Sequence, residues 1–276
     1  MDNGITLPAD VQILSHQIAG HRFQKDENGG IKSGLLQKDK YVLKPLQSPP
    51  RGEVEVKFYR TIFDLSIINP VHEELRNLVP PFYGTEEYII NGTNITYLKL
   101  LDIAKPFRKP CIMDIKIGKK TYDPKATEKK INSETQKYPR MGEIGFRILG
   151  MQIYKPEENS FQFKDRFFGL SLEPEDVTEN GLKLFFTQKS SLRRDVLQLV
   201  LSKLGRINEF FHIQREFAFY SSSLLIIYEG DESQSPVESL ADVRMIDFTH
   251  VFETNEADDN YIYGIGMLIK SLSSLL

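Results

Sequence analysis

The chain has 276 residues, of which 40% are hydrophobic and 11% aromatic, and these proportions exclude wholesale disorder. Its 35 lysines and arginines stand against 38 aspartates and glutamates, so the net charge of −3 argues against indiscriminate nucleic-acid binding. The single cysteine, Cys111, excludes an internal disulfide and a cysteine-based zinc site. Neither a signal-peptide pattern nor about 18 consecutive apolar residues occur, so we expect a cytoplasmic or nuclear protein that is not secreted and has no transmembrane segment.

The predicted elements follow one another in an α+β order. In the first part of the chain we expect a strand at 41–44 that Pro45 ends, a helix from about Glu53 and a strand at 97–101. In the second part we expect strands at 111–118, 146–154, 223–228 and 243–248, a helical stretch from about Pro124 and a long helix over 197–211. The acidic, serine-rich stretch 229–242 is predicted to be an exposed loop. The chain thus divides into two lobes near residue 104.

Positive charge is concentrated in residues 105–140. This segment contains eleven basic and four acidic side chains, a local charge of +7, and the rest of the chain therefore carries −10. A local cluster attracts a small polyanion such as a phosphorylated ligand, whereas the acidic remainder repels a longer one such as nucleic acid. A solvated lysine-rich surface is the alternative interpretation.

Asp114 and Lys116 stand two residues apart on the predicted strand 111–118. Side chains alternate along a strand, so these two share a face that is opposite to Cys111 and its apolar neighbours. Because a buried charge without a partner is costly, we expect both to face a cleft. There Asp114 would be a base or orienting group for a hydroxyl, and Lys116 a clamp for a phosphoryl group. A structural ion pair between them is the alternative.

Three further charged residues stand at informative places. Asp247 lies on an otherwise apolar strand, where its carboxylate needs a cation, and Mg²⁺ is typically held by one or two carboxylates together with substrate phosphates. Capping a turn or pairing with Arg244 are its alternative roles. Lys44 ends a strand and Glu55 follows on the predicted helix, a pairing that positions nucleotide phosphates in kinases of the protein-kinase type.

The predicted helix after Asp123 and Pro124 begins with an aspartate cap followed by a proline in the first turn. Four of its side chains fall at i, i+3, i+4 and i+7 and so share one face: Lys130, Ser133, Glu134 and Lys137. Its two lysines could straddle a ligand that carries several phosphates. A solvated lysine face is the commoner use of this spacing.

Three motifs in this order resemble the inositol polyphosphate kinase family: Pro110-x-x-x-Asp114-x-Lys116-x-Gly118, Ser222-Ser223-Leu224-Leu225 and Ile246-Asp247-Phe248. Further segments resemble its animal-type multikinase branch: Ser15-His16-Gln17, Ala19-Gly20-His21, Pro50-Arg51-Gly52, Tyr122-Asp123-Pro124, Lys137-Tyr138-Pro139 and Glu143-Ile144-Gly145-Phe146. The inositol hexakisphosphate kinases, which share the core motifs, are the alternative branch.

This resemblance implies a two-lobed α+β kinase fold that is distantly related to protein kinases, with an antiparallel sheet in each lobe. Residues 1–103 would form the ATP-binding lobe, and residues 104–276 the catalytic and metal-binding lobe with inserted inositol-phosphate-binding helices at about 124–140. The implied reaction transfers the γ-phosphoryl group of ATP, with Mg²⁺, to inositol tris- and tetrakisphosphates towards inositol pentakisphosphate. A monomer without a nucleic-acid partner is implied, and a phosphatidylinositol bisphosphate headgroup at a membrane surface is left open as a further acceptor.

The resemblance also assigns roles to individual residues. Asp114 and Lys116 match the catalytic pair, and Asp247 matches the metal-binding aspartate. Nucleotide-binding positions are matched by Lys44, Glu55, Leu101, Asp102, Ile103 and Asp247. Inositol-phosphate-binding positions are matched by Arg51, Lys130, Ser133, Glu134, Lys137 and His250. Ser133 and Glu134 replace two glutamines of the vertebrate multikinases, and a glutamate opposes phosphate binding unless it faces hydroxyls.

Alternative functions remain at this point. An inositol hexakisphosphate kinase would make inositol pyrophosphates. A non-catalytic inositol phosphate binding module would need the basic face but neither Asp114 nor Asp247. A scaffold for partner proteins would use the acidic stretch 229–242, although such loops are commonly only solvated.

Overall fold

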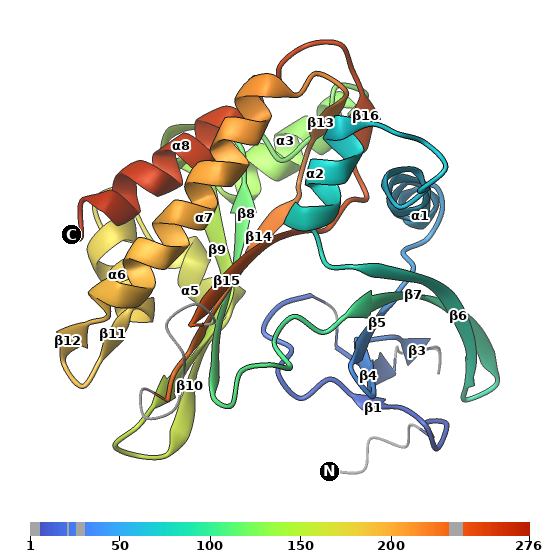
Figure 1. Cartoon of the computed structure of the whole chain (residues 1–276), viewed down its shortest axis with the longest axis horizontal. Coiled ribbons are helices and arrows are strands. Elements are labelled where there is room, and N and C mark those ends of the chain that lie inside the picture. The colour runs from blue at the N-terminus through green and yellow to red at the C-terminus, as the bar shows by residue number, and fades with distance from the viewer. Residues whose placement is uncertain (1–5, 21, 26–30, 232–239) are drawn as a thin grey trace.

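The computed structural model describes residues 6–20, 22–25, 31–231 and 240–276 (Figure 1). Two five-stranded sheets dominate it, one with the strand order β1-β4-β5-β7-β6 and one with the order β10-β9-β8-β14-β15. Every pairing in both sheets is antiparallel. The predicted α+β class with two antiparallel sheets is therefore confirmed. Most of the predicted loop 229–242 lies outside the described residues.

The first sheet consists of β1 (Gln12–Ile13), β4 (Leu36–Lys38), β5 (Tyr41–Pro45), β6 (Phe82–Ile90) and β7 (Thr93–Leu101), and β2 (Gln24–Lys25) pairs with β3 (Ile31–Lys32) beside it. Asn91 and Gly92 make the turn between β6 and β7, with φ angles of 47° and 81°. Positive φ at both positions of a two-residue turn matches the twist of an antiparallel hairpin. One face of this sheet buries Leu36, Leu43 and Tyr97 in a small core.

Two helices connect the first sheet to the rest of the molecule. Helix α1 (Arg51–Ile62) begins two residues before the predicted Glu53, and α2 (Pro70–Leu78) is capped by the side chain of Asn69. Phe58 of α1 and Leu75 of α2 belong to the same hydrophobic core as the second sheet. The lobe boundary at residue 103 therefore stays a prediction.

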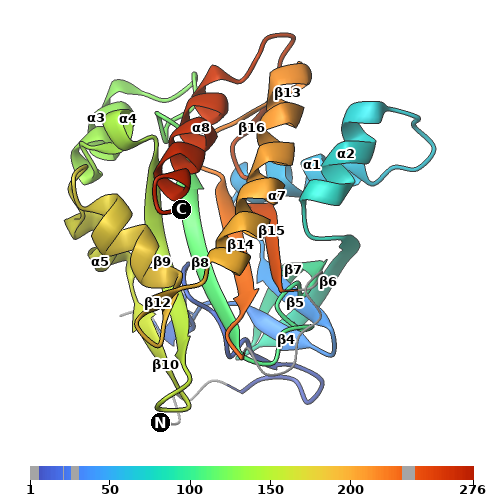
Figure 2. The same cartoon turned by 60° about the vertical axis from the view of Figure 1, so that its left-hand side comes forward.

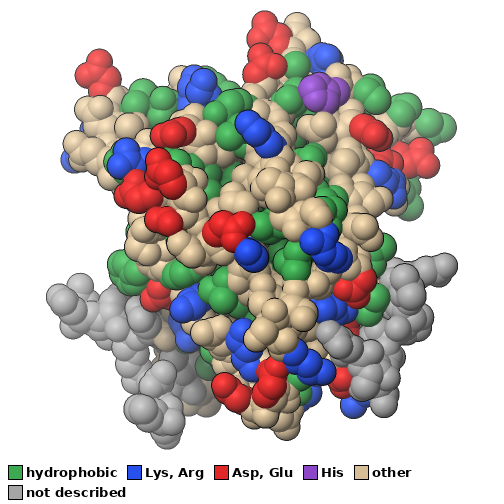
Figure 3. All heavy atoms as spheres, turned by 90° about the vertical axis from the view of Figure 1, so that its left-hand side faces the viewer, with side chains coloured by type: hydrophobic (Ala, Val, Ile, Leu, Met, Phe, Trp, Pro, Cys, Tyr) green, Lys and Arg blue, Asp and Glu red, His purple; other side chains and the backbone are tan. Residues whose placement is uncertain are grey.

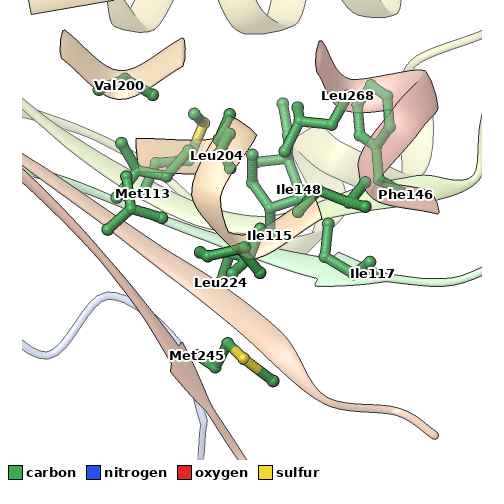
Figure 4. Close-up of a cluster of buried hydrophobic side chains, with 14 of the residues drawn as sticks. Met113, Ile115, Ile117, Phe146, Ile148, Val200, Leu204, Leu224, Met245 and Leu268 are labelled. Atoms are coloured by element: carbon green, nitrogen blue, oxygen red, sulfur yellow. The ribbon is translucent and has the colours of Figure 1, made fainter. Parts of the chain in front are cut away.

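The second sheet consists of β8 (Pro110–Ile117), β9 (Phe146–Lys155), β10 (Ser160–Lys164), β14 (Ser223–Glu229) and β15 (Ala241–Ile246). The long helices α7 (Arg194–Ile213) and α8 (Asp259–Ser273) run side by side across one of its faces (Figures 1 and 2). Figure 4 shows Ile115 of β8 in the layer between sheet and helices, near Leu204 of α7 and Leu268 of α8. Because this face of β8 is apolar and buried, the charged residues Asp114 and Lys116 lie on its other face.

The remaining elements are short: α3 (Glu128–Lys137), α4 (Met141–Ile144), α5 (Arg166–Ser171), a π-helical turn η1 (Val177–Leu182), α6 (Lys183–Phe185), and the pairs β11 (Thr187–Gln188) with β12 (Ser191–Leu192) and β13 (Phe217–Phe219) with β16 (Val251–Glu253). Among the described residues no helix is both long and apolar enough to cross a membrane. On the face seen in Figure 3, basic and acidic side chains are interspersed.

The predicted start of the substrate helix was wrong. Helix α3 begins at Glu128, and its cap is Thr127, whose hydroxyl accepts a hydrogen bond from the Lys130 N–H. Asp123 does not cap a helix, because its two carboxylate oxygens have other partners: the N–H of Lys125 at 2.9 Å and Nδ1 of His250 at 3.0 Å. The Asp-Pro signal marks a turn here and not a helix.

Cys111 is a core thiol, as its apolar neighbours on the strand indicated. The side chain is fully buried, and Sγ accepts a hydrogen bond from the Tyr154 N–H at 3.2 Å. Burial raises the pKa of this thiol to about 11, so it stays protonated and is a poor nucleophile.

Candidate active site

A cavity of about 500 Å³ lies where the two sheets meet. Val42 and Lys44 of β5 line it from the first sheet, Asp114 of β8 and Leu225 of β14 from the second. The connecting segment 101–104, which includes the predicted hinge residues Leu101, Asp102 and Ile103, also lines it. The structure thus places predicted residues from both sheets around one cleft.

Lys44 is the centre of a three-residue ion network. Its Nζ lies 2.7 Å from Oε1 of Glu55 and 2.5 Å from Oδ1 of Asp247. Burial alone would lower the pKa of Lys44, but the two carboxylates outweigh it and the pKa is raised. The network therefore holds a permanently charged ammonium group at the cleft, supported by a glutamate that is only 1% exposed.

Asp114 is buried without a cation in direct contact. Within the described part of the chain its Oδ1 has no hydrogen-bond partner, and the residue is 6% exposed. Burial, reinforced by the negative charge of Asp247, raises the pKa of Asp114 to about 7. A carboxylate in this state can take up a proton near neutral pH, which is what a general base must do.

Lys116 shares the cleft face of β8 with Asp114 but forms no ion pair with it. Its Nζ donates hydrogen bonds to the carbonyl oxygen of Ser221 at 2.9 Å and to the Ser221 hydroxyl at 2.6 Å. Ser221 has a φ of 58°, a left-handed conformation that is uncommon for serine. Burial lowers the pKa of Lys116. The structural ion-pair interpretation is thus wrong for these two residues.

Asp247 lies one residue after β15, and not on the strand as the sequence pattern indicated. It adopts a φ of 66°, in the left-handed region that aspartate tolerates better than most residues. The next residue, Phe248, donates its N–H to Oε1 of Glu55 at 3.0 Å. Arg244 pairs with Asp242 and not with Asp247. Although burial opposes it, the ion pair with Lys44 holds the pKa of Asp247 below its usual value.

The carboxylates fit a divalent cation that a bound nucleotide helps to hold. Among the described residues, no three histidine, cysteine, aspartate or glutamate side chains converge on one point. Asp114 and Asp247 nevertheless line the same cleft, and Oδ1 of Asp114 is an acceptor without a partner in the described residues. One or two carboxylates are the usual protein contribution where phosphates and water complete the coordination.

On α3, contacts join three of the four residues that were predicted to share a face. Oε1 of Glu134 lies 2.7 Å from Nζ of Lys130 and 4.0 Å from Nζ of Lys137, and Oε2 accepts a hydrogen bond from the Thr121 hydroxyl. Although burial alone would raise it, the pKa of Glu134 is lowered by the lysines and Thr121. Ser133 is exposed.

Two further predicted substrate residues lie on other elements. His250 precedes β16 and contacts Asp123; burial lowers its pKa, and the charges of Lys116 and Lys130 act in the same direction. His250 is therefore an electrostatic neighbour of both lysines. Arg51, the first residue of α1, is exposed and lines the cavity.

Sequence reasoning missed two residues of this region. His16 lies with Nε2 3.2 Å from Oδ1 of Asp102, and both line the cavity. Arg147 of β9 is buried, and it lies opposite Lys116 in the pairing of β9 with β8. An arginine inside the apolar run 146–154 was the available signal for the second residue, whereas nothing in the sequence joined residues 16 and 102.

The sequence matches the family model described as inositol polyphosphate kinase over residues 97–273, which is more than half of the chain. The chain belongs to the inositol polyphosphate kinase family. The family expected from the three ordered motifs is therefore confirmed.

Known relatives also support the animal-type resemblance. The chain is 42% identical to the human inositol polyphosphate multikinase over 230 residues, which are 83% of this chain and 53% of that protein. It is 31% identical to mouse inositol hexakisphosphate kinase 3 over 201 residues, 65% of this chain and 50% of that protein. The chain thus spans about half the length of these relatives.

A solved structure shares the fold. The inositol phosphate multikinase from S. cerevisiae, determined in complex with ADP and Mn²⁺, is similar with a TM-score of 0.68 at 26% sequence identity. The match covers 88% of this chain and 99% of that chain.

Proposed function

We propose that this chain is an ATP-dependent inositol polyphosphate multikinase, which transfers the γ-phosphoryl group to hydroxyls of inositol tris- and tetrakisphosphates towards inositol pentakisphosphate. One observation carries the proposal: Lys44, held by Glu55 and Asp247, lines the same cleft as the buried Asp114, whose Oδ1 has no hydrogen-bond partner in the described part of the chain. Phosphoryl transfer needs positioning and charge neutralisation more than covalent chemistry, and this arrangement offers both.

On the nucleotide side, the chain offers an apolar and a charged part of the cleft. Ile103, Ile112 and Leu225 form one hydrophobic cluster beside the connecting segment, a surface suited to an adenine ring. Lys44 contacts the nucleotide phosphates in our proposal. Asp247, with Asp114 beside it, would hold a divalent cation, Mg²⁺ in our proposal, which supplies neutralisation of phosphate charge when bound.

On the acceptor side, Asp114 takes the proton of the attacking inositol hydroxyl as the new oxygen–phosphorus bond forms and ADP departs. Its pKa of about 7 suits this transfer near neutral pH. Lys116 stabilises the negative charge on the transferring phosphoryl oxygens. The site for inositol phosphates comprises Arg51, Lys130, Ser133, Glu134, Lys137 and His250. Glu134 is the acidic member of this set, and its carboxylate opposes phosphate binding unless it faces hydroxyls.

We also propose how the chain is divided and where it acts. The ATP-binding lobe comprises residues 1–103 and the catalytic lobe residues 104–276, and the protein acts as a monomer in the cytoplasm or the nucleus. The concentration of basic residues in 105–140 and the mixed charges on the face in Figure 3 support a small polyanion as ligand, in preference to nucleic acid. A phosphatidylinositol bisphosphate headgroup at a membrane surface is a candidate acceptor to be tested in parallel.

The test is a parallel assay of acceptors. The pure protein is incubated with Mg²⁺ and labelled ATP and with inositol tris-, tetrakis-, pentakis- or hexakisphosphate, or with vesicles containing phosphatidylinositol bisphosphate, and the products are resolved. The control variant is Asp114→Asn, which should lower kcat at least about a thousandfold and leave inositol phosphate binding largely intact.

The outcomes of this assay distinguish three functions. Phosphorylation of the tris- and tetrakisphosphates supports the multikinase. Product only from the hexakisphosphate supports an inositol hexakisphosphate kinase, and binding without any product supports a non-catalytic module. Near-normal turnover by Asp114→Asn contradicts the role given to Asp114.

A further inference from the structure

Arg147 is a buried cation without a counter-ion. The residue is 7% exposed, and among the described residues its Nε has no hydrogen-bond partner and no carboxylate lies within ion-pair distance of the guanidinium group. Burial lowers the pKa of this group, and the negative charges of Glu134 and Asp114 act in the opposite direction. An unpaired buried charge costs stability, so a function that needs it is the natural explanation.

The position of Arg147 relates it to the reaction centre. Strand β9 pairs with β8 so that Arg147 lies directly opposite Lys116, and directly opposed residues of an antiparallel pair project from the same face. The charge of Arg147 lowers the pKa of Lys116, as a neighbouring cation must. Two cations therefore stand together on the face of the second sheet that carries Asp114, although neither of them lines the cavity itself.

A buried aromatic ring fixes the guanidinium group. Cζ of Arg147 lies 5.6 Å from the ring centroid of Tyr138, and the Tyr138 hydroxyl is anchored by donating to the Leu172 carbonyl oxygen at 3.1 Å. Contact with a ring uses the flat face of a guanidinium group and leaves its N–H edge free for hydrogen bonds. This contact restrains the guanidinium group near the Tyr138 ring before any ligand binds.

Three carboxylates act electrostatically on these two cations: Glu134 and Asp114 act on both, and Asp247, which already pairs with Lys44, acts on Lys116. Glu134 influences both Lys116 and Arg147 electrostatically, but its hydrogen bonds go to Lys130 and Thr121. The region therefore carries more positive than negative charge. A phosphate group, with a charge of about −2 and several acceptor oxygens, is the ligand chemistry that satisfies it.

We propose that Arg147 is a specificity-determining residue, which donates hydrogen bonds from its guanidinium N–H groups to one phosphate group of the inositol polyphosphate acceptor. This inference rests on the proposed function, since it uses the same acceptor site. It adds a phosphate contact from β9, below α3, to those assigned on α3 itself, and it favours acceptors with a phosphate at that position over those with a hydroxyl.

A purely structural role makes a different prediction. If Arg147 only filled space against Tyr138, Arg147→Leu would lower the melting temperature and leave ligand affinity unchanged. If it is an unpaired cation kept for a ligand, Arg147→Leu keeps or raises the melting temperature while affinity falls, because apolar replacement of a buried charge is commonly neutral or stabilising. Stability and affinity thus move in different directions.

The experiment measures binding without turnover. Affinities for inositol trisphosphate and inositol tetrakisphosphate, and for ADP with Mg²⁺, are determined by calorimetry for the wild type, Arg147→Leu and Arg147→Lys. The matched control is Arg140→Leu, which removes an exposed arginine of the same segment that pairs with Glu173. Melting temperatures are recorded for all four proteins.

We expect Arg147→Leu to bind at least one of the two inositol phosphates about tenfold to a hundredfold more weakly, in line with loss of charge-assisted hydrogen bonds. ADP affinity should stay unchanged, Arg147→Lys should recover part of the loss, and Arg140→Leu should bind like the wild type. Unchanged inositol phosphate binding by a folded Arg147→Leu, or a wild type that binds neither ligand, overturns the inference. Binding that depends on Arg147 without kinase activity retains it and rejects the proposed function.

Discussion

The carboxyl group of Asp114 is buried, and no lysine, arginine or histidine of the described residues forms an ion pair with it. The side chain can therefore exchange a proton near neutral pH, whereas the ion pair with Lys44 holds the pKa of Asp247 below its usual value. The same property has a cost in stability. At pH values between 3.8 and about 7, Asp114 is protonated in the folded state, whereas the same aspartate is ionised in the unfolded state. In this range a rise in pH favours the unfolded state.

This linkage gives a first prediction. Because the folded pKa is raised from 3.8 to about 7, the contribution of Asp114 to the free energy of unfolding falls as the pH rises through that window. Relative to the wild type, Asp114→Asn should gain roughly 2 to 4 kcal/mol between pH 4 and pH 8, apart from an offset that does not depend on pH. Denaturant unfolding of both proteins at several pH values measures the difference, and a difference that stays constant contradicts the raised pKa.

Lys44 gives a second prediction, in which the substitution lowers the free energy of unfolding. Its removal in Lys44→Met leaves the buried Glu55 and the neighbouring Asp247 without their cation, and an uncompensated buried charge is strongly destabilising. We expect the free energy of unfolding to fall by about 3 kcal/mol at pH 7.5 and nucleotide affinity to fall with it. Denaturant unfolding and ADP calorimetry measure the two effects. A variant as stable as the wild type would show that the network is not energetically coupled.

Sequence reasoning identified the partner residues unequally. Lys44 and Glu55 stand on a strand and the next helix, so their pairing followed from local pattern. The contact between Lys44 and Asp247 did not, because it depends on the left-handed turn that ends β15. Arg147 was missed because a charge within an apolar strand gives no sign, without the register, of which residue lies opposite.

Helix α3 is held differently from the long helices that cover the second sheet. None of its ten residues is buried, so its cap and its ion pairs locate it and hydrophobic packing does not. The start of this helix was predicted wrongly because the capping signal could not show the long-range contact of Asp123. The Asp-Pro signal is local, whereas the carboxylate of Asp123 is taken by His250, which lies 127 residues further along the chain.

Lys130 provides a third prediction, at the level of this helix. Because Lys130 lies half-exposed on α3 and far from the adenine side of the cleft in our proposal, Lys130→Ala should raise KM for the inositol phosphate about tenfold and leave KM for ATP unchanged. Initial rates with each substrate varied in turn measure both constants. Lys129→Ala, an exposed neighbour on the same helix, is the control, and an unchanged KM in Lys130→Ala removes that residue from the site.

Glu134 provides a fourth prediction on the same helix. Its carboxylate lies among Lys130, Lys137 and the cations of the sheet, where it repels an incoming phosphate. Glu134→Gln keeps the size and the hydrogen-bonding ability but removes the charge, so KM for an acceptor that places a phosphate there should fall about threefold to tenfold. Glu128→Gln in the first turn is the control. A higher KM would show instead that Glu134 binds acceptor hydroxyls.

At the scale of the whole molecule, the cleft that we propose to bind nucleotide is lined by residues of both sheets. Ligand that binds only the folded state at about a hundred times its Kd adds about 2.7 kcal/mol to the free energy of unfolding. ADP with Mg²⁺ should therefore raise the melting temperature by roughly 5 to 10 °C, a chelator should reduce the shift, and Asp247→Asn should weaken it. Thermal unfolding measured by fluorescence tests this, and equal shifts in all three conditions contradict a metal-assisted site at Asp247.

Six of the strands and the long helix over 197–211 were predicted from the sequence, and their bounds differ by only a few residues from the structure. Strands β1, β4 and β6 of the first sheet and β10 of the second were not predicted. The sharing of one hydrophobic core between α1, α2 and the second sheet was not predictable. Periodicity shows that a helix has a buried face, but it does not show which sheet that face contacts.

The ion pair between Lys44 and Asp247 has a consequence for biosynthesis, because 203 residues separate its members. At about 5 to 20 residues per second, a ribosome needs roughly 10 to 40 seconds to make the intervening chain. During that time Lys44 has been made without β15 and Asp247, and the cavity lacks the residues that Ile246 and Asp247 contribute to its lining. If the cavity binds nucleotide as we propose, the nascent chain should acquire that ability only after β15 has left the ribosome.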